Sequence, residues 1–489
     1  MIREELVNRL RICLGHVPTA EQERAMQLFA DFLTDREERT VFVLRGSAGT
    51  GKTTLAAAVV RALLGLNQKL VLMAPTGRAA KVLSGYAGMP AYTIHKRIYR
   101  QKTAGDMSAF CLNFNQSTDT LFLVDEASMV SNAGFSDTFG SGCLLDDLIQ
   151  FVYGGRNCRL MLIGDRAQLP PVGEEESPAL VAGVLRGYGL DVFQTDLNEV
   201  LRQSQESGIL WNATQVRCMM ADGGWSLPKI RFHGFPDIVN VPGDELIESL
   251  ATSYSRVGMD DTIVVTRSNK RANIYNQGIR NTVLDREDEL CRGERIMIVK
   301  NNYYWLSADG CSQLAKSQEP IANSPFSFIA NGDIAVVQRV RNVHELYGFR
   351  FAEVTMTLPD YDNYELTATV MLDTLTTEAP ALTREQQEQL YNKVMEDYMD
   401  VPYKSERLKK LKEDKYYNAL QIKYAYAVTC HKAQGGQWAH VYIDQGYMTD
   451  DMVAADYVHW LYTALTRATE KVFLVNWPKT QVMPPQTSS

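Results

Sequence analysis

A glycine-rich loop that ends in a lysine and a threonine is the part of this sequence best suited to chemistry. Residues 46–53 read GSAGTGKT, between the apolar run 41–44 and the helix-forming segment 54–64. Glycines let backbone N–H groups turn inward around phosphate oxygens, and the following helix adds its N-terminal dipole. Lys52 is placed to reach the β- and γ-phosphates, and Thr53 to ligate Mg²⁺. The spacing therefore predicts a nucleoside triphosphate site. Its expected binding residues are Gly46, Gly49, Thr50, Gly51, Lys52, Thr53 and Thr54.

Two adjacent carboxylates end another apolar run. The segment LFLVDEASM, residues 121–129, places Asp125 and Glu126 at a strand end, the edge where α/β sheets present their ligands. We expect Asp125 to hold Mg²⁺ through water and Glu126 to polarise the attacking water. A lone Asp–Glu pair is commonly a solvated strand terminus, but its combination with the phosphate loop favours a catalytic pair.

A third strand end carries a neutral amide. In GDRAQLPPV, residues 164–172, Gln168 can contact both a γ-phosphate oxygen and the attacking water. Taken alone, the segment is more typical of an ordinary turn fixed by Pro170 and Pro171.

Phosphoryl transfer also needs cations that a phosphate loop does not supply. Negative charge spreads over the γ-phosphoryl oxygens, and arginines from elsewhere in the chain commonly stabilise it. The candidates are Arg202 in LNEVLRQ and Arg467 in YTALTRA. A single arginine is more often a surface residue, so this assignment depends on the whole pattern. If Arg467 acts, hydrolysis takes place between two lobes, and closure of the cleft depends on the nucleotide.

The elements that must position these residues form two α/β lobes. Short apolar runs alternate with helical patterns in both halves of the chain, which is typical of parallel, helix-covered sheets. The runs lie at 41–44, 70–74, 121–125 and 160–165, and then at 262–266, 424–429, 440–444 and 471–475.

Two insertions interrupt these lobes. Residues 97–116 predict a hairpin, with Phe110 and Phe114 as candidates for a strand-splitting wedge. Alternating, turn-rich sequence from about 300 to 420 predicts a small β-barrel of the Src-homology-3 kind with a charged helical extension. The aromatic residues 303–305 either stack on bases or fill the barrel core. The expected division is 1–96 with 117–196 for lobe one, 97–116 for the hairpin, 197–299 with 421–480 for lobe two, 300–420 for the barrel, and 481–489 for a tail.

Composition narrows the class of protein. The chain has 489 residues, 45% of them apolar, and a net charge of −8, so any nucleic-acid contact must be local, in a groove. Its 8 cysteines include no CxxC pair, which argues against a zinc site or a disulfide framework. No apolar run approaches the roughly 20 residues that span a bilayer. We expect a cytoplasmic protein with no membrane contact.

Nine segments occur in the order of the motifs of superfamily-one helicases. They are TAEQ (19–22), GSAGTGKT (46–53), APTGRAAK (74–81), TIHK (93–96), VDEAS (124–128), GDRAQLPPV (164–172), LNEVLRQ (197–203), VTCHKAQGGQW (428–438) and YTALTRA (462–468). Over nearly its full length the chain resembles the RecD/Dda/Pif-type branch, with the RecD/Dda side favoured. Members of this branch move 5′ to 3′ on single-stranded DNA.

The resemblance implies roles that the residues alone leave open. It implies that Gln22 reads the adenine, that Arg202 and Arg467 are the arginine fingers, and that Gln434 and Gly435 lie near the nucleotide. The residues that would face the DNA backbone are Thr76, Thr93, His95, Thr429 and His431. Threonine hydroxyls suit phosphate contacts without sequence readout, whereas a lone histidine is more often structural. Gln437 stands where the family often has an acidic ribose contact, so sugar selectivity stays open.

We therefore expect an ATP- and Mg²⁺-dependent 5′→3′ translocase and DNA helicase. Its expected partners are single-stranded DNA and single/double-strand junctions in replication, recombination or repair, and it is expected to act as a monomer. Two alternatives remain: an RNA-directed helicase, and a nucleic-acid-dependent ATPase that switches conformation without processive unwinding. A P-loop kinase is disfavoured by the motifs of the second lobe.

Overall fold

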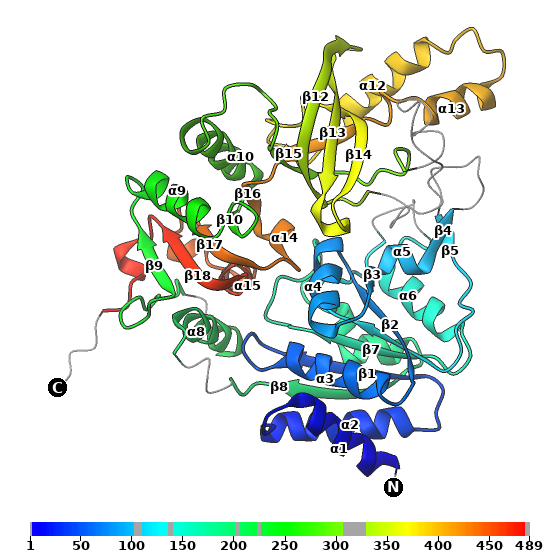
Figure 1. Ribbon diagram of the computed structural model, residues 1–489, viewed down its shortest axis with the longest axis vertical. Helices are drawn as coiled ribbons and strands as arrows, with labels where there is room; N and C mark the ends of the chain where they lie inside the picture. Colours follow the sequence, from blue (N-terminus) through cyan, green and yellow to red (C-terminus); the bar gives the residue numbers. More distant parts are fainter. Residues whose placement is uncertain are drawn as a thin grey trace.

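The chain folds into two α/β lobes that lie side by side, with a β-barrel above them (Figure 1). The computed structural model describes residues 2–101, 110–134, 140–200, 206–222, 226–306 and 329–484. The expected fold class, two RecA-like lobes with a hairpin and a barrel insertion, is confirmed.

Lobe one is built on a parallel sheet with the strand order β3-β2-β6-β7-β1-β8. The strands are β1 (Thr40–Gly46), β2 (Lys69–Ala74), β3 (Ala91–Thr93), β6 (Thr120–Val124), β7 (Arg159–Gly164) and β8 (Asp191–Leu197). The helices are α1 (Ile2–Leu14), α2 (Ala20–Thr34), α3 (Lys52–Leu64), α4 (Gly77–Ala87), α5 (Ile94–Ile98), α6 (Leu144–Tyr153) and α7 (Ala182–Gly187). The central strands β1, β6 and β7 are almost wholly buried, as expected for a sheet covered on both faces.

Lobe two has a second parallel sheet with the order β16-β10-β17-β18-β9. Its strands are β9 (Ile238–Val241), β10 (Thr262–Thr266), β16 (Ala427–Thr429), β17 (Trp438–Asp444) and β18 (Ala468–Val475). Its helices are α8 (Gly208–Asp222), α9 (Leu246–Arg256), α10 (Asn269–Gly278), α14 (Cys430–Ala433) and α15 (Ala455–Leu465). The helix α15 precedes β18 and carries Tyr462 and Thr463 toward lobe one.

The inserted barrel is closed and joins five strands in the order β11-β12-β13-β14-β15. They are β11 (Arg295–Ile298), β12 (Ile334–Leu346), β13 (Phe349–Leu358), β14 (Tyr364–Met371) and β15 (Leu420–Tyr424). The strands β14 and β15 pair in parallel, since the helices α12 (Arg384–Glu396) and α13 (Lys404–Lys412) connect them. The predicted limits of 300 and 420 therefore cut off the first and last strands, which are short, buried and indistinguishable by pattern from strands of lobe two.

The aromatic segment next to the barrel decides between the two interpretations for two of its residues. Tyr304 and Trp305 are 1% and 0% exposed and belong to the barrel core, so they do not offer their faces to bases. Tyr303 is half-buried, and its ring packs on Phe110 of the hairpin with 4.7 Å between ring centroids.

The predicted hairpin is present as β4 (Tyr99–Gln101) paired antiparallel with β5 (Phe110–Leu112). Its connection, residues 102–109, lies outside the described residues. Phe110 is 5% exposed and anchors the hairpin on Tyr303, which does not suit a wedge residue. Phe114 is 75% exposed, with the Arg100 guanidinium 5.2 Å from its ring centre. Phe114 is thus the more accessible of the two wedge candidates.

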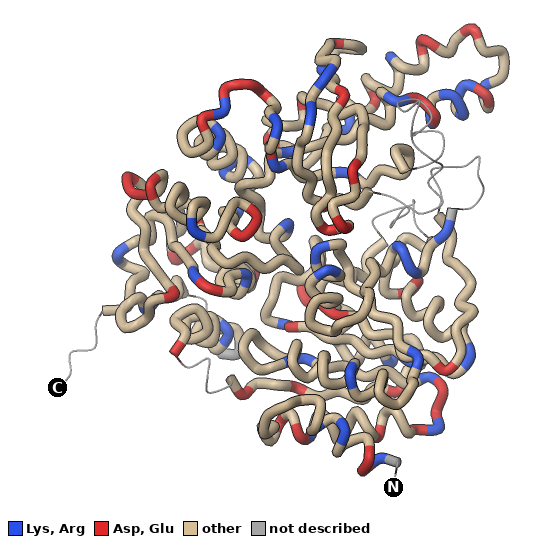
Figure 2. Tube along the Cα trace, viewed as in Figure 1, with Lys and Arg blue, Asp and Glu red and all other residues tan. Residues whose placement is uncertain are grey.

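Every helix in the described part of the chain is too short or too polar to cross a membrane. Basic and acidic residues are interspersed over both lobes and the barrel (Figure 2). One local contrast matters for the site: an acidic turn of the barrel faces basic residues at the start of α4.

Candidate nucleotide site and strand interface

The glycine-rich loop connects β1 to α3 in a conformation that only glycine adopts easily. Gly49 and Gly51 have φ angles of +77° and +82°, in the left-handed region. A Cβ on Gly46 would lie 2.9 Å from Thr50 Oγ1 and 3.0 Å from the carbonyl of Leu197. The loop therefore needs these glycines to wrap around a phosphate with its amides.

A cavity of about 550 Å³ opens in front of this loop, between the two lobes. Lobe one and lobe two both contribute to its wall, as expected for hydrolysis at a lobe interface. The predicted residues that it brings together are Gly49, Gly51, Lys52, Thr53, Thr54, Asp125, Glu126, Gln168, Gly435 and Arg467.

Lys52 is held by lobe one at the floor of the cavity. Its Nζ donates to the carbonyl of Ser47 at 2.8 Å and lies 4.0 Å from Asp165 Oδ2. Asp165 also accepts a 2.6 Å hydrogen bond from the hydroxyl of Tyr462 in lobe two. The same hydroxyl accepts from the backbone N–H of Ala48 at 2.8 Å. Tyr462 therefore links the phosphate loop to Asp165 across the lobe interface.

Neither Asp165 nor Tyr462 was assigned a role from the sequence, although both lie in the quoted motifs. Asp165 directly follows the buried strand β7, in the same way that Asp125 follows β6, and this was the available signal. Tyr462 gave no comparable signal, because its partners are more than 290 residues away in the chain.

The two carboxylates after β6, Asp125 and Glu126, lie on the cavity wall in different surroundings. Asp125 accepts hydrogen bonds from the N–H of Glu126 at 2.8 Å and from the hydroxyl of Tyr86. Removal from bulk water raises the pKa of both Asp125 and Glu126, and their mutual repulsion adds to the rise for Glu126. Arg467 and Lys52 oppose the rise for Glu126. Glu126 is thus a more basic carboxylate than an exposed one, which suits a group that draws a proton from water.

The donor set fits Mg²⁺ bound together with a triphosphate. No group of three or more His, Cys, Asp or Glu residues that could hold a metal occurs in the described ranges. Thr53 and Asp125 nevertheless line the same wall, and both offer the oxygen ligands that Mg²⁺ prefers. Mg²⁺ commonly takes one or two protein oxygens and completes its shell with phosphates and water.

Arg467 reaches the cavity from lobe two. It is 4% exposed, its Nε donates to the carbonyl of Thr463 at 3.1 Å, and its Nη1 lies 3.7 Å from Glu126 Oε1. This geometry holds the guanidinium beside the site where negative charge would develop. The other candidate, Arg202, lies outside the described residues.

Gln168 offers an acceptor into the cavity. Its side chain is 6% exposed, and its Oε1 has no hydrogen-bond partner among the described residues. A buried polar atom without a partner is uncommon in a folded protein. Its position on the cavity wall would let it accept a hydrogen bond from a water or a ligand in the cavity.

Four of the predicted nucleotide residues do not line the cavity. Gly46 and Thr50 belong to the body of the loop. Gln22, in α2, is fully buried: its Nε2 donates to Thr50 O at 3.3 Å, and its Oε1 accepts from Thr19 N at 3.1 Å. Gln434 donates instead to the carbonyl of Leu169 at 2.6 Å and joins the lobes.

The predicted strand contacts are distributed along the border between lobe one, lobe two and the barrel. Thr76 and His431 line a cavity of about 200 Å³, and Thr93 lines another of about 480 Å³. Thr76 and Thr93 cap α4 and α5 by accepting from Ala79 N and Lys96 N, each at 3.2 Å.

The two remaining strand candidates line neither cavity. Thr429 immediately precedes α14, and its side chain makes no capping hydrogen bond. Burial lowers the pKa of His95 to about 4, so this imidazole is neutral at pH 7 and would meet a phosphate only as a neutral donor.

A turn of the barrel closes over these cavities. The turn η5 (Pro359–Tyr361) rests on α4, where Lys81 Nζ donates to Pro359 O at 2.7 Å and lies 3.7 Å from Asp360 Oδ1. A Cβ on Gly77 would lie 2.6 Å from the Tyr361 hydroxyl. The barrel thus covers the cavities that contain the predicted strand contacts.

Two parallel-sheet lobes with a phosphate loop and an inter-lobe cavity define a two-lobed P-loop nucleoside triphosphatase. Residues 18–218 match a family model described as an AAA domain, and residues 424–475 match the UvrD-like helicase C-terminal domain.

Three relatives illustrate the similarity. The ATP-dependent DNA helicase dda of Enterobacteria phage T4 is 26% identical over 56% of this chain and 60% of its own length. The ATP-dependent RecD2 DNA helicase of Deinococcus radiodurans is 31% identical over 32% of this chain and 20% of its own length. The uncharacterized protein R530 of Acanthamoeba polyphaga mimivirus is 21% identical over 93% of this chain and 98% of its own length.

A solved Pif1 helicase from Bacteroides, in complex with ADP-AlF3 and ssDNA, shares 14% identity over 96% of this chain and 95% of that chain, with a TM-score of 0.44. The chain is thus similar to ATP-dependent DNA helicases of the RecD/Dda kind, and it spans less than two thirds of the length of dda and RecD2.

Proposed function

We propose that this protein is an ATP-driven motor that moves 5′ to 3′ along single-stranded DNA and separates the duplex ahead of it. The observation that carries the proposal is the inter-lobe cavity, where Lys52 and Glu126 of lobe one meet Arg467 of lobe two. The triphosphate is the substrate, bound in this cavity by the loop amides and the α3 N-terminus.

In the proposed hydrolysis, each residue acts on a different part of the transferring group. Glu126 orients the attacking water and draws its proton, while Gln168 Oε1 accepts a hydrogen bond from the same water. Lys52 and Arg467 neutralise charge on the phosphoryl oxygens. Thr53 and Asp125 would hold Mg²⁺, which supplies further charge neutralisation when bound.

Coupling to movement rests on bonds that cross the lobe interface. Beyond the Tyr462 link, Leu169 N donates to Thr463 Oγ1 at 2.8 Å, and Arg78 donates to Gln437 O at 2.9 Å. Because these contacts adjoin the nucleotide cavity, the nucleotide state would bias the lobes between closed and open arrangements. Alternating grip by the two lobes on a strand beneath the barrel then gives directed steps. In this proposal the motor acts as a monomer, because one chain carries both lobes that form the cavity.

The decisive experiment compares two partial duplexes that differ only in carrying a 5′ or a 3′ single-stranded tail, with ATP and Mg²⁺. We expect separation from the 5′ tail alone, and none by Lys52→Ala. Separation from the 3′ tail alone would keep the motor and overturn the polarity. ATP hydrolysis that opens neither substrate would favour a conformational switch over a helicase.

An RNA-directed helicase is the second candidate, because threonine hydroxyls such as those of Thr76 and Thr93 suit phosphate contacts in either kind of strand. Stimulation of ATP hydrolysis by matched DNA and RNA oligonucleotides separates the two, and we expect the stronger stimulation by DNA.

A further inference from the structure

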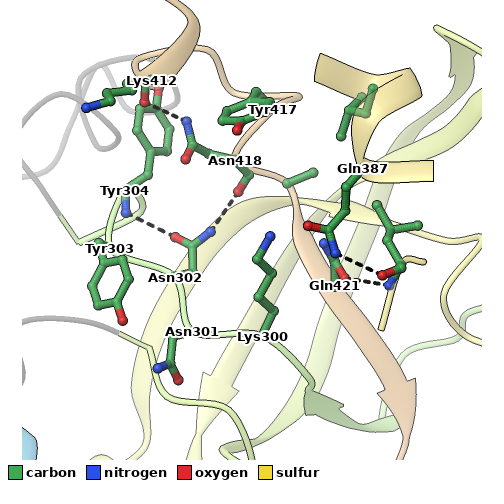
Figure 3. A pocket seen from close by; sticks show the side chains of 13 residues that line it. Lys300, Asn301, Asn302, Tyr303, Tyr304, Gln387, Lys412, Tyr417, Asn418 and Gln421 are labelled. Atoms are coloured by element: carbon green, nitrogen blue, oxygen red, sulfur yellow. Dashed lines mark hydrogen bonds between the residues drawn. The ribbon is translucent and has the colours of Figure 1, made fainter. Parts of the chain in front are cut away.

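A separate cavity of about 360 Å³ lies on the barrel, far in sequence from the nucleotide loop (Figure 3). It is bounded by the end of β11, the first turns of α12, the end of α13 and the approach to β15. Its size falls in the range of small-ligand sites, roughly 300–1,000 Å³. The residues used below are Lys300, Asn302, Gln387, Tyr417, Asn418 and Gln421.

The amide side chains of the wall are bonded to the wall itself. Asn302 Nδ2 donates to Asn418 O at 2.8 Å, Gln387 Nε2 to Leu382 O at 2.9 Å, and Gln421 Oε1 accepts from Leu382 N at 2.9 Å. The cavity is therefore preformed, and these amides do not require a ligand to satisfy them.

Lys300 is the exception in this wall. Its ammonium group projects between Asn302 and Gln387 in Figure 3 and makes no hydrogen bond or ion pair with any residue that the structure describes. The side chain of Lys300 is exposed to solvent, so its charge is open to an anion that enters the cavity.

The rest of the lining fits a nucleotide rather than a bare anion. No Asp or Glu occurs among the described lining residues, although the whole chain carries a net charge of −8. The ring of Tyr417 is 37% exposed, and aromatic rings of this kind stack on bases of any sequence. A cation and an accessible aromatic ring in one cavity are the groups that hold one unit of a nucleic-acid strand, by its phosphate and its base.

The cavity also lies beside the hairpin that carries the wedge candidate. Tyr303 is part of its lining, and the Tyr303 ring packs on Phe110 of β5. A strand deflected by the hairpin would pass this side of the barrel, next to the cavity.

We propose that this barrel cavity binds a nucleotide of the strand displaced at a single/double-strand junction, with its phosphate on Lys300 and its base on Tyr417. The inference rests on the proposed helicase function and extends it to the strand that is not translocated. Capture of that strand would slow its return to the duplex.

The test measures, without ATP, the affinity of each variant for a fork with two oligothymidine tails and for a single oligothymidine strand. We expect Lys300→Ala to weaken fork binding about 5- to 10-fold and to lower the slope of log affinity against log salt by about 1. Tyr417→Ala should weaken fork binding about 5-fold or more. Binding of the single strand should not change. Lys404→Ala, an exposed α13 lysine outside the cavity, is the matched control and should leave both affinities unchanged.

Equal affinities of Lys300→Ala and wild type for the fork, or equal weakening for fork and single strand, would overturn the inference. If thymidine 5′-monophosphate binds the wild type but not Lys300→Ala while fork binding is unaffected, the cavity takes a free nucleotide and the strand assignment fails. Failure of the proposed function would look different, because the wild type itself would then show no DNA-stimulated ATP hydrolysis.

Discussion

At the scale of single residues, a substitution of Glu126 should separate nucleotide binding from ATP hydrolysis. Glu126→Gln keeps the shape of the side chain but removes the carboxylate that, in the proposed mechanism, draws a proton from water, so we expect ATP hydrolysis to fall about 100-fold or more. Nucleotide binding should persist, because the loop amides and Lys52 remain. Steady-state hydrolysis and binding of a fluorescent ATP analogue measure the two. Lys52→Ala is the comparison and should lose binding as well. Full turnover by Glu126→Gln would remove Glu126 from the mechanism.

The sequence predicted those residues whose role follows from local spacing. Lys52 and Thr53 belong to one loop, and Asp125 with Glu126 to one strand end, so pattern and chemistry coincide. The roles of Asp165 and Tyr462 were not predicted, because the hydrogen bond between them forms only when distant parts of the chain meet. Gln22 is a different case: the family resemblance implies a contact with the adenine, and in the folded helix its amide donates to the carbonyl of Thr50.

At the scale of elements, the packing of the barrel turn η5 on α4 requires a glycine at position 77. A Cβ on Gly77 would meet the Tyr361 hydroxyl at 2.6 Å and Asp333 Oδ1 at 3.2 Å, and would disturb the hydrogen bond between those groups. We expect Gly77→Ala to lower the free energy of unfolding by about 1–3 kcal/mol. Urea unfolding measures the change.

The same helix provides the control for this substitution. A Cβ on Gly85 would have open space around it, so Gly85→Ala should raise the stability of α4 by about 0.5–1 kcal/mol. If both alanine variants shift stability in the same direction, the contact between the barrel turn and α4 does not hold the barrel in place.

Elements were predictable where burial is uniform and were missed where it is not. The runs that became β1, β6 and β7 are apolar throughout, so they read as strands at once. The edge strand β8 carries mixed polar sequence, and β3 has three residues, so neither gave a pattern. One apolar run, 424–429, was expected to be a single strand, but it is shared between β15 of the barrel and β16 of lobe two.

At the scale of the whole molecule, the barrel's attachment should depend on pH through Asp333. Burial, with a smaller contribution from Asp360, raises the pKa of Asp333 to about 7, against the hydrogen bonds from Ala330 N and Tyr361. A raised carboxyl pKa means that the folded state holds a proton which the unfolded chain releases from about pH 4. Stability from this group is therefore complete below about pH 4 and is lost as the pH rises to about 7.

The variant Asp333→Asn has no carboxyl group at this position, so its stability should not depend on the ionisation of residue 333. As the pH rises from 5 to 8, wild type should lose stability that the variant keeps. The melting temperature of the variant relative to wild type should therefore rise, by the equivalent of about 1–3 kcal/mol in the free energy of unfolding. Thermal unfolding of both proteins over that range measures the difference. A constant difference across the range would mean that Asp333 is ionised throughout.

The last prediction concerns the hydrogen bonds that join the two lobes through Tyr462. Tyr462→Phe removes the hydroxyl that bridges Ala48 N and Asp165, and should leave the two lobes less tightly coupled through the nucleotide cavity. Tyr457→Phe is the matched control: it removes another buried hydroxyl from α15, bonded to Gln445 Oε1 at 2.5 Å, away from the phosphate loop. Both variants should lose about 1–2 kcal/mol of stability. Only Tyr462→Phe should reduce the ratio of DNA-stimulated to basal ATP hydrolysis, by about 10-fold, because communication between strand and nucleotide passes through the lobe interface. Equal ratios in the two variants would show that Tyr462 supports the fold and does not couple the sites.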